Sequence, residues 1–449
     1  MRVDFFQVSL VMPNWQYVPS KIGSRNAPKL PSNPTIPRKI PEKSQQNPNV
    51  FVRRSRTVTN WPHHLEYVQK INNYGHVLLT CPCHTHILLD MHINSETPYN
   101  ELPLLPLQQS FETIPVMQAA IRANRALAEL KGIAQTIPNQ SIFINTISLK
   151  EAQYSSEIEN IITTTDELYQ AFSVSDGKMT QSAKEVLQYR NALWQGFSQL
   201  KKRGILTTSV MNEIQATLLD NNAGIRSLPG TALKNAITGK IIYTPPVGKD
   251  VILDKLKNLE TYIHSETVDP LIKMAIMHYQ FESIHPYYDG NGRTGRILNV
   301  LYLIYEGLLD QPILYLSHYI IQHKEEYYRL LQNCTFKEDY EPWILYMLRG
   351  VEESAKESIS KIKSIQLLMQ ETMAIIKEKL PKIYSKELVE VLFQQPYCKI
   401  KFLEDYGLAK RKTASEYLYQ LEAIGVLESK KIGRETLFLN VRLFELFRG

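Results

Sequence analysis

The stretch HPYYDGNGRTGR, residues 285–296, carries an imidazole, a carboxylate, three glycines and two arginines within one loop and helix start. Gly290 and Gly292 allow backbone angles that turn successive N–H groups toward one point, and the helix that begins there adds its positive N-terminal end. Arg293 and Arg296 are three residues apart, so they lie on one helical face, and the planar guanidinium group of each can bind an anion through two hydrogen bonds. The stretch therefore predicts a phosphate-binding turn followed by a helix.

The other polar residues of this stretch add a base and a metal ligand. Asp289 supplies a hard oxygen suited to Mg²⁺, which one carboxylate and the phosphates of a nucleotide ordinarily hold. Asn291 adds a neutral donor and acceptor beside it. His285, with an ordinary pKa of about 6.5, can be neutral and take a proton from an attacking hydroxyl. Together these groups favour phosphoryl or nucleotidyl transfer, in which positioning and charge neutralisation do most of the catalysis.

Hydrophobic periodicity around the stretch predicts a mainly helical protein. A helix is expected from Phe111, with Gly132 as its stop, and a strand or hairpin arm at Lys240–Thr244, ended by two prolines. A long helical stretch, interrupted once, is expected over residues 341–380. The other expected helices are at residues 149–172, 182–203, 207–219, 250–265, 269–282, 292–305 and from 317 onward.

The last 65 residues predict a winged helix-turn-helix, with helices at 386–394, 401–406 and 411–424 and a β-wing after them. A DNA-binding domain of this kind would place phosphate contacts at the start of the third helix and in the wing, which here hold Lys410, Arg411, Lys412, Lys430, Lys431 and Arg434. Residues 385–449 nevertheless carry 11 Lys/Arg against 9 Asp/Glu, and the same fold also docks proteins or dimerises. The sequence leaves DNA, a protein partner and a homodimer open.

Residues 1–93 are expected to be a poorly ordered extension, because they show neither helical nor strand periodicity for long. Residues 1–90 also hold 11 Lys/Arg against 4 Asp/Glu, and the rest of the chain holds 40 Lys/Arg against 41 Asp/Glu. The net charge of +6 therefore comes from residues 1–90 and does not indicate a nucleic-acid partner. His63, His64, Cys81 and Cys83 match no closed zinc-ligand spacing. Four cysteines in 449 residues favour a reducing compartment, the cytoplasm, and the absence of a long apolar run predicts no membrane contact.

The segment 285–296 resembles the Fic motif, H-P-F-x-D/E-G-N-G-R-x-x-R, with Tyr287 in place of the usual phenylalanine. The chain is similar, from about Asn94 to its C-terminus, to Fic-domain adenylyltransferases that carry a C-terminal winged helix. The resemblance implies a helical region at 94–200, a catalytic core with a β-hairpin flap at 201–349, a linker helix at 350–384 and the winged helix at 385–449.

The resemblance also implies a reaction, the transfer of AMP from ATP to a Ser, Thr or Tyr hydroxyl of a target protein or of the chain itself, with release of pyrophosphate. His285 would be the base and Asp289 the Mg²⁺ ligand. Asn291 and the backbone of Gly290 and Gly292 would bind the α- and β-phosphates, and Arg293 would also contact these phosphates. Arg296 would bind the γ-phosphate. A reversed nucleotide would give phosphate transfer. The alternatives are another nucleotide, or a DNA-binding regulator whose Fic domain senses nucleotide or modifies only itself.

Two further segments have roles implied by the resemblance. Ile241, Ile242, Tyr243 and Thr244 correspond to the flap that pairs with the backbone of the target. The segment SSEIEN, residues 155–160, matches an inhibitory helix signature, S/T-x-x-x-E-G/N. Ser155 and Glu159 are four residues apart and are expected on one helical face, from which Glu159 would form a bidentate ion pair with Arg296. ATP would then meet an arginine that is already occupied.

Overall fold

The computed structural model describes residues 93–449 except 138, 140, 174–178, 236–237, 267, 433–434 and 449, and the backbone of four short strands before them. One compact unit contains residues 1–19 and 95–449, and another contains residues 20–94. In the latter, β2 (Val68–Ile71), β3 (Val77–Thr80) and β4 (His86–Leu89) form an antiparallel sheet. The remainder of residues 1–92, with His63, His64, Cys81 and Cys83, lies outside the described residues, so the expectation of poor order is untested.

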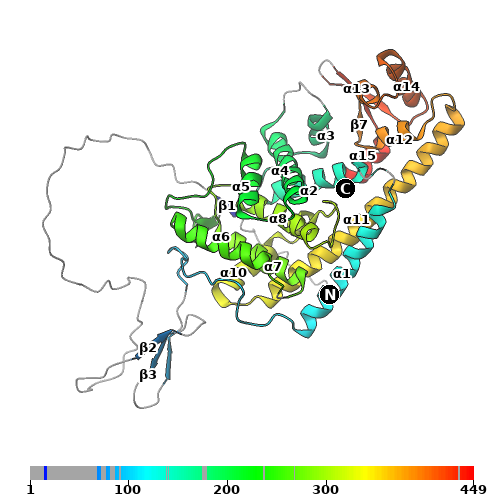
Figure 1. The fold of residues 1–449 in the computed structure, drawn as a ribbon. Coiled ribbons are helices and arrows are strands. Elements are labelled where there is room, and N and C mark those ends of the chain that lie inside the picture. The colour runs from blue at the N-terminus through cyan, green and yellow to red at the C-terminus, as the bar shows by residue number, and fades with distance from the viewer. Residues whose placement is uncertain are drawn as a thin grey trace, which may run out of the picture. The chain divides into compact units, whose positions relative to one another are not determined.

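The larger unit is mainly helical, as the sequence predicts (Figure 1). Its first eleven helices are α1 (Ile114–Gln135), α2 (Ser141–Ile158), α3 (Thr165–Ser173), α4 (Gln181–Arg203), α5 (Thr208–Leu219), α6 (Lys249–Ile263), α7 (Pro270–Ile284), α8 (Asn291–Tyr305), α9 (Leu316–Gln322), α10 (Lys324–Lys337) and α11 (Glu341–Lys379). None of the helices in the described part of the chain is long and apolar enough to cross a membrane.

Threonine and aspartate side chains cap several of these helices. Thr113, Thr180 and Thr207 accept a hydrogen bond from the first turn of α1, α4 and α5, and Asp269 does the same for α7 ahead of its first residue, Pro270. Such caps satisfy backbone N–H groups that have no partner inside the helix. They explain why the expected starts of these helices agree with the structure to within a few residues.

The expectation of one helix over residues 149–172 is wrong, because α2 starts earlier and the chain breaks at residues 159–164. Asn160 has a φ of 63°, which a continuing right-handed helix does not allow. Thr164 and Glu167 then form a reciprocal capping box, in which each side chain accepts the other's backbone N–H. The break places Glu159 in a turn rather than on a helix.

Two other expected helix interruptions are absent. Gly132 does not stop α1, which continues to Gln135, since a glycine in a helix costs only about 1 kcal/mol relative to alanine. The long helix α11 runs unbroken through 39 residues. It includes Gly350, where a Cβ would lie 2.8 Å from the ring of Tyr319, so that glycine permits close packing instead of a break.

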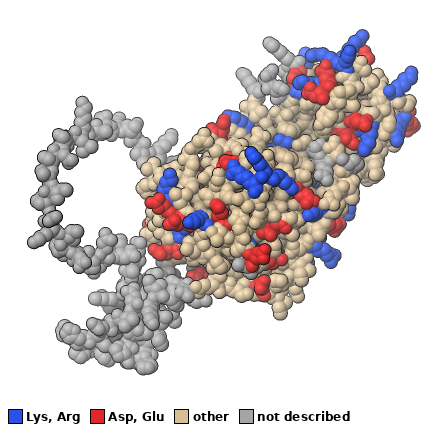
Figure 2. All heavy atoms as spheres, viewed as in Figure 1, with Lys and Arg blue, Asp and Glu red and all other residues tan. Residues whose placement is uncertain are grey.

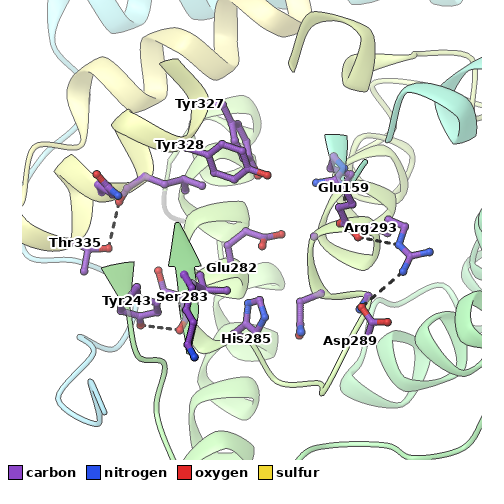
Figure 3. Close-up of a pocket in the computed structure, with 18 of the residues that line it drawn as sticks. Glu159, Tyr243, Glu282, Ser283, His285, Asp289, Arg293, Tyr327, Tyr328 and Thr335 are labelled. Carbon is purple, nitrogen blue, oxygen red and sulfur yellow. Dashed lines mark hydrogen bonds and ion pairs between the residues drawn. The ribbon is translucent and has the colours of Figure 1, made fainter. Parts of the chain in front are cut away.

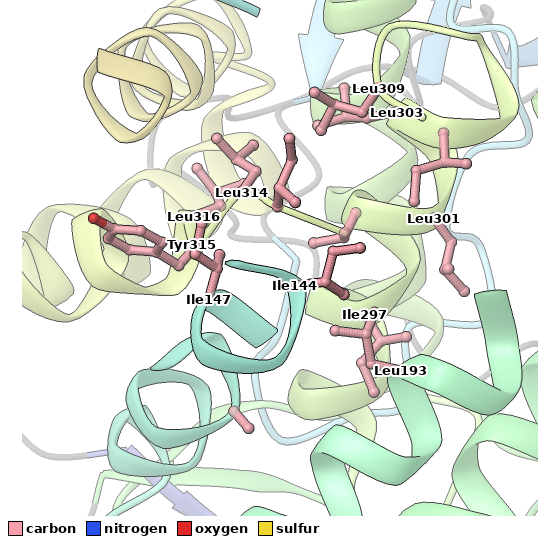
Figure 4. Packing of buried hydrophobic residues seen from close by; sticks show 14 of the residues in the cluster. Ile144, Ile147, Leu193, Ile297, Leu301, Leu303, Leu309, Leu314, Tyr315 and Leu316 are labelled. Carbon is pink, nitrogen blue, oxygen red and sulfur yellow. The ribbon is translucent and has the colours of Figure 1, made fainter. Parts of the chain in front are cut away.

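The core surrounds α7 and α8, and nearly every residue of both helices is buried. Figure 4 shows one part of it, in which Ile144 of α2 lies near Ile297 of α8 and Ile147 of α2 lies near Tyr315 and Leu316. Side chains of the segment 309–316, which enters α9, complete this apolar cluster. Because α8 is held on several sides, its first turn is a rigid base for the groups that precede it.

The hairpin expected at residues 240–244 is present. Strand β6 (Ile241–Tyr243) pairs antiparallel with β5 (Leu233–Asn235), and the backbone of β1 (Trp15–Tyr17) pairs with the other edge of β5. Thr244 follows β6, and its carbonyl accepts a hydrogen bond from the backbone N–H of Tyr99. The sheet order is therefore β1-β5-β6, with β6 at an edge.

The C-terminal region has the expected helices and wing, in an α+β arrangement. It contains α12 (Lys386–Phe393), β7 (Tyr397–Cys398), α13 (Ile400–Asp405), α14 (Arg411–Ala423), β8 (Glu428–Ile432), β9 (Glu435–Leu439) and α15 (Val441–Arg448). The sheet order is β7-β9-β8. Helix α15 was not expected from the sequence, and its residues Phe444 and Phe447 pack against the ring of Tyr169 in α3.

The basic residues of this region occupy different environments. Lys410, Arg411 and Lys412 are exposed, whereas Nζ of Lys430 lies 3.0 Å from the carboxylate of Asp166 in α3. Lys431 is exposed, and Arg434 lies outside the described residues. Basic and acidic side chains are interspersed on the face shown in Figure 2, which displays no large field of one sign.

Candidate active site

The segment 285–296 follows α7 and includes the start of α8, and it lies at the wall of a cavity of about 600 Å³ (Figure 3). His285 caps the C-terminus of α7 with a φ of 49°, and Gly290 precedes α8 with a φ of 76°. At Gly290 a side chain would be strained and would also meet Leu218 at 3.1 Å. The two left-handed residues let the chain reverse between the helices and bring His285 and the first turn of α8 to one cavity.

The loop between the helices is fixed by hydrogen bonds of Asn291 and Tyr287. The amide of Asn291 donates to the carbonyl of Tyr287 and accepts its N–H, both at 2.8 Å. The Tyr287 ring is buried, and its hydroxyl donates to the side chain of Asn212 in α5 at 2.8 Å. The side chain of Asn291 therefore holds the loop in shape, while the backbone N–H groups at the start of α8 have no partner within that helix.

The imidazole of His285 is kept neutral by its surroundings. Burial is the main cause that lowers its pKa, to about 3, and the nearby Arg226 lowers it further. The carbonyl of Glu282 and the carboxylate of Glu159 act in the opposite direction. Nδ1 of His285 has no hydrogen-bond partner among the described residues. The ring is therefore in the protonation state that a general base requires.

Glu159 reaches the two arginines of the segment, as Figure 3 shows for Arg293. Its Oε1 lies 2.7 Å from Nη2 of Arg296, and its Oε2 lies 3.0 Å from Nε of Arg293. The expected ion pair with Arg296 is present, but it is not bidentate, because the second carboxylate oxygen contacts Arg293. Burial by itself would raise the pKa of Glu159, but Arg293 and Arg296 together lower it, so the carboxylate is charged.

Ser155 completes the contacts of Arg296. Its hydroxyl accepts from Nε at 2.7 Å, and its backbone carbonyl accepts from Nη2 at 2.9 Å. Gly292 makes room for this arrangement, since a Cβ there would lie 2.6 Å from Oε1 of Glu159. Gly292 thus serves the contact with Glu159, whereas its backbone is helical and it is Gly290 that has the left-handed conformation of the turn.

Asp289 lies at the edge of the cavity, with 53% of its side chain exposed. Burial of the rest of the group, in the first place, raises its pKa, and its Oδ1 accepts from the N–H of Gly290 at 2.6 Å. No group of three or more His, Cys, Asp or Glu side chains able to hold a metal occurs in the described part of the chain. A single accessible carboxylate fits Mg²⁺ that enters with a nucleotide, because the phosphates supply other ligands.

The structure adds residues that sequence reasoning missed. Glu185 of α4 lies 3.6 Å from Arg293, so three carboxylates, those of Glu159, Glu185 and Asp289, face that guanidinium. Tyr327 and Tyr328 of α10 line the opposite part of the cavity. Nothing in the local sequence of these residues indicates the site, since they come from helices that reach it only in the folded chain.

Glu282 is another missed residue, although its spacing offers a signal, as it lies three residues before His285 on α7. Its Oε1 has no hydrogen-bond partner among the described residues. Burial, in the first place, raises its pKa to about 7, against the attraction of Arg296. This carboxyl group is therefore half protonated near neutral pH.

Replacing Glu282 with glutamine should stabilise the protein in a pH-dependent way. Between about pH 4.5 and 7 the folded state retains a proton that the unfolded chain loses, so burial of Glu282 makes stability fall as the pH rises through this window. We expect Glu282→Gln to raise the Tm by about 2–5 °C at pH 8 and to leave it unchanged near pH 4.5. Calorimetry checks this, with Glu112→Gln on the surface as the control. An equal gain at both pH values would contradict the assignment.

Three family models match successive parts of the chain. The model described as Fic/DOC family N-terminal matches residues 117–198, and the model described as Fic/DOC family matches residues 205–303. A third, described as the C-terminal domain of SoFic-like protein adenylyltransferases, matches residues 368–443. The chain belongs to the Fic/DOC family. The second model includes the whole segment 285–296, and the first includes Glu159.

Similar proteins of the Fic/DOC family have low identity to this chain. Protein adenylyltransferase fic-1 of Caenorhabditis elegans is 30% identical over 122 residues, 26% of this chain and 23% of the relative. A probable protein adenylyltransferase of Aquifex aeolicus is 27% identical over 175 residues, 37% of this chain and 51% of the relative. The chain therefore spans between a quarter and half of the length of these relatives.

Among solved structures, a Fic family protein from Desulfovibrio desulfuricans G20 is 18% identical, with a TM-score of 0.45, and the match covers 73% of this chain and 96% of that one. The C. elegans Fic-1 structure is 21% identical, with a TM-score of 0.43, and the match covers 55% of this chain and 74% of that one.

Proposed function

We propose that this protein is an autoinhibited protein adenylyltransferase that transfers AMP from ATP to a hydroxyl of a target protein or of itself. Family membership and the names of the relatives support the reaction class. The observation that carries the autoinhibition is the position of Glu159 between Arg293 and Arg296. Both cations that a triphosphate would use are already paired with a carboxylate of the same chain.

In the proposed reaction, the target hydroxyl attacks the α-phosphate. The target hydroxyl gives its proton to His285 as its oxygen bonds to the α-phosphorus, and the bond from that phosphorus to the β-phosphate oxygen breaks. Pyrophosphate leaves with the electrons of that bond. Backbone N–H groups at the start of α8 bind the phosphates, and Arg293 and Arg296 neutralise them. Asp289 would hold Mg²⁺, which would supply further positive charge.

The position of the hairpin of β5 and β6 at the cavity supports a role in presenting the target. Leu233, Lys234 and Tyr243 line the cavity that holds His285. A target segment that pairs with the hairpin backbone would bring a hydroxyl toward the imidazole, and main-chain pairing would make the docking tolerant of sequence. The docking segment is Ile241–Thr244, as the resemblance implies.

Labelled nucleotides test the reaction. We expect the Glu159→Gly protein, with Mg²⁺ and ATP labelled at the α-phosphate, to acquire label on itself or on a protein in a cell lysate. ATP labelled at the γ-phosphate should give none, because that phosphate leaves in pyrophosphate. Label from the γ position would instead indicate phosphate transfer, and label from neither would overturn the proposed function for ATP.

A further inference from the structure

Arg226, in the segment between α5 and β5, is a buried arginine next to the catalytic loop. Only 1% of it is exposed, and the sequence gives no periodic or motif signal for it. Its own backbone N–H donates to the carbonyl of Pro286 at 3.0 Å. The neighbouring Ile225 forms an isolated antiparallel β-bridge with Tyr287. Residues 225–226 thus lie along the loop that follows His285.

The guanidinium of Arg226 binds the end of α7. Its Nε donates to the carbonyl of His285 at 2.7 Å, and its Nη2 lies 3.2 Å from the carbonyl of Ile284. Carbonyls in the last turn of a helix have no helical N–H partner, and a cation near them is favoured by the helix dipole. The left-handed conformation of His285 carries an energetic cost, and these contacts offset it. Arg226 therefore fixes the backbone from which the imidazole projects.

The same nitrogen also binds the segment that leaves the hairpin. Nη2 of Arg226 donates to the carbonyl of Pro246 at 2.5 Å, three residues after the end of β6. A second connection runs in parallel, because the hydroxyl of Tyr243 donates to the carbonyl of Ser283 in α7 at 2.8 Å. One buried side chain thus contacts both the loop that carries the base and the chain that follows the hairpin.

We propose that Arg226 is a positioning residue that holds the flap in register with His285, so that a hydroxyl docked on the flap lies within reach of the imidazole. The planar guanidinium suits this role, since it directs several donors in fixed directions to carbonyls of two segments. Its side chain donates to the backbone carbonyls of Ile284, His285 and Pro246, which belong to the end of α7 and to the segment that follows the flap. This inference rests on the proposed transfer to a flap-docked hydroxyl.

The test uses Arg226→Met and Arg226→Lys in the Glu159→Gly background. Lys255→Met is the matched control, because Lys255 is also a buried cation that donates to a backbone carbonyl, that of Leu102, away from the loop. We expect Arg226→Met to bind a non-hydrolysable ATP analogue within about twofold of the parent. Its self-labelling rate at saturating ATP should fall about 100-fold, because a misplacement near 1 Å costs about that factor. Arg226→Lys should fall about tenfold.

Hydrogen exchange separates positioning from a loss of stability. In Arg226→Met, the amides of residues 241–244 and those of residues 284–291 other than Pro286 should exchange faster together, while α1 and α11 remain unchanged. Lys255→Met should leave both segments and the labelling rate as in the parent. If Arg226→Met does not fold, Arg226→Lys carries the same test with the same readouts.

Two outcomes would overturn the inference. One is an unchanged labelling rate in a folded Arg226→Met protein, and the other is a fall in rate matched by an equal fall in nucleotide affinity or by exchange that rises throughout the chain. If the Glu159→Gly parent itself acquires no label, the proposed function fails, whereas the exchange experiment still reports whether Arg226 couples the flap to the loop.

Discussion

Glu159→Gly should bind ATP about 10- to 100-fold more tightly than the wild type and label itself correspondingly faster at low ATP concentrations. The wild-type carboxylate makes charge-assisted contacts of 2.7 and 3.0 Å with Arg296 and Arg293. Hydrogen bonds between charged groups contribute about 1.5–3 kcal/mol each, and 1.4 kcal/mol corresponds to a tenfold change in affinity. A triphosphate that enters the wild-type cavity must displace these contacts, and glycine removes the competitor.

The structure also indicates that this substitution is tolerated. Glu159 follows the last residue of α2 and precedes the left-handed Asn160, so a glycine there lies in a turn and does not interrupt a helix. Glu157→Gly is the matched control, because it removes a carboxylate within the last turn of α2 without removing the pairs with the arginines. Calorimetric titration with a non-hydrolysable ATP analogue and a labelling time course check the expectation. Equal affinities for wild type and Glu159→Gly, with both proteins folded, would exclude Glu159 as the inhibitor.

Removal of the His285 imidazole should nearly abolish transfer, with a fall of about 10²- to 10⁴-fold in the labelling rate of the Glu159→Gly protein. No proton acceptor would remain at that position for the target hydroxyl. Nucleotide affinity should change little, because in the proposed function the phosphates bind to the start of α8 and to the arginines. The comparison of rate with affinity therefore separates the base from the binding groups.

The backbone conformation of His285 determines which substitution removes the imidazole without also destabilising the protein. Its φ of 49° is unfavourable for alanine, whereas asparagine adopts left-handed conformations more readily. His285→Asn should consequently retain the wild-type Tm, and His285→Ala should lose part of it, while both lose transfer. If His285→Asn is folded, binds the nucleotide analogue and still labels at the parental rate, His285 is not the base.

Local sequence was sufficient to predict where a helix or strand begins wherever a short-range rule applied. The start of α8 at Asn291 follows from Gly290, and the hairpin follows from a β-rich run between glycine and proline. The helix starts at α4 and α5 follow from threonine caps. The same reasoning failed at Gly132, because the free-energy cost of a glycine in a helix is small compared with the gain from burying one face of α1. It also failed at residues 159–164, where the left-handed Asn160 ends one helix and a capping box begins the next.

The sequence by itself determined the chemistry of the segment 285–296, its family resemblance and the mainly helical fold, because spacing along the chain fixes which side chains one turn and one helix face present. Only the tertiary structure showed that Glu159 bridges Arg293 and Arg296, that Glu185 and Glu282 line the cavity, and that Arg226 contacts the carbonyl of His285. These contacts join residues that are tens to more than a hundred positions apart, or depend on how deeply α7 is buried. Distance and burial between such residues are set by packing of the whole core, which no local pattern specifies.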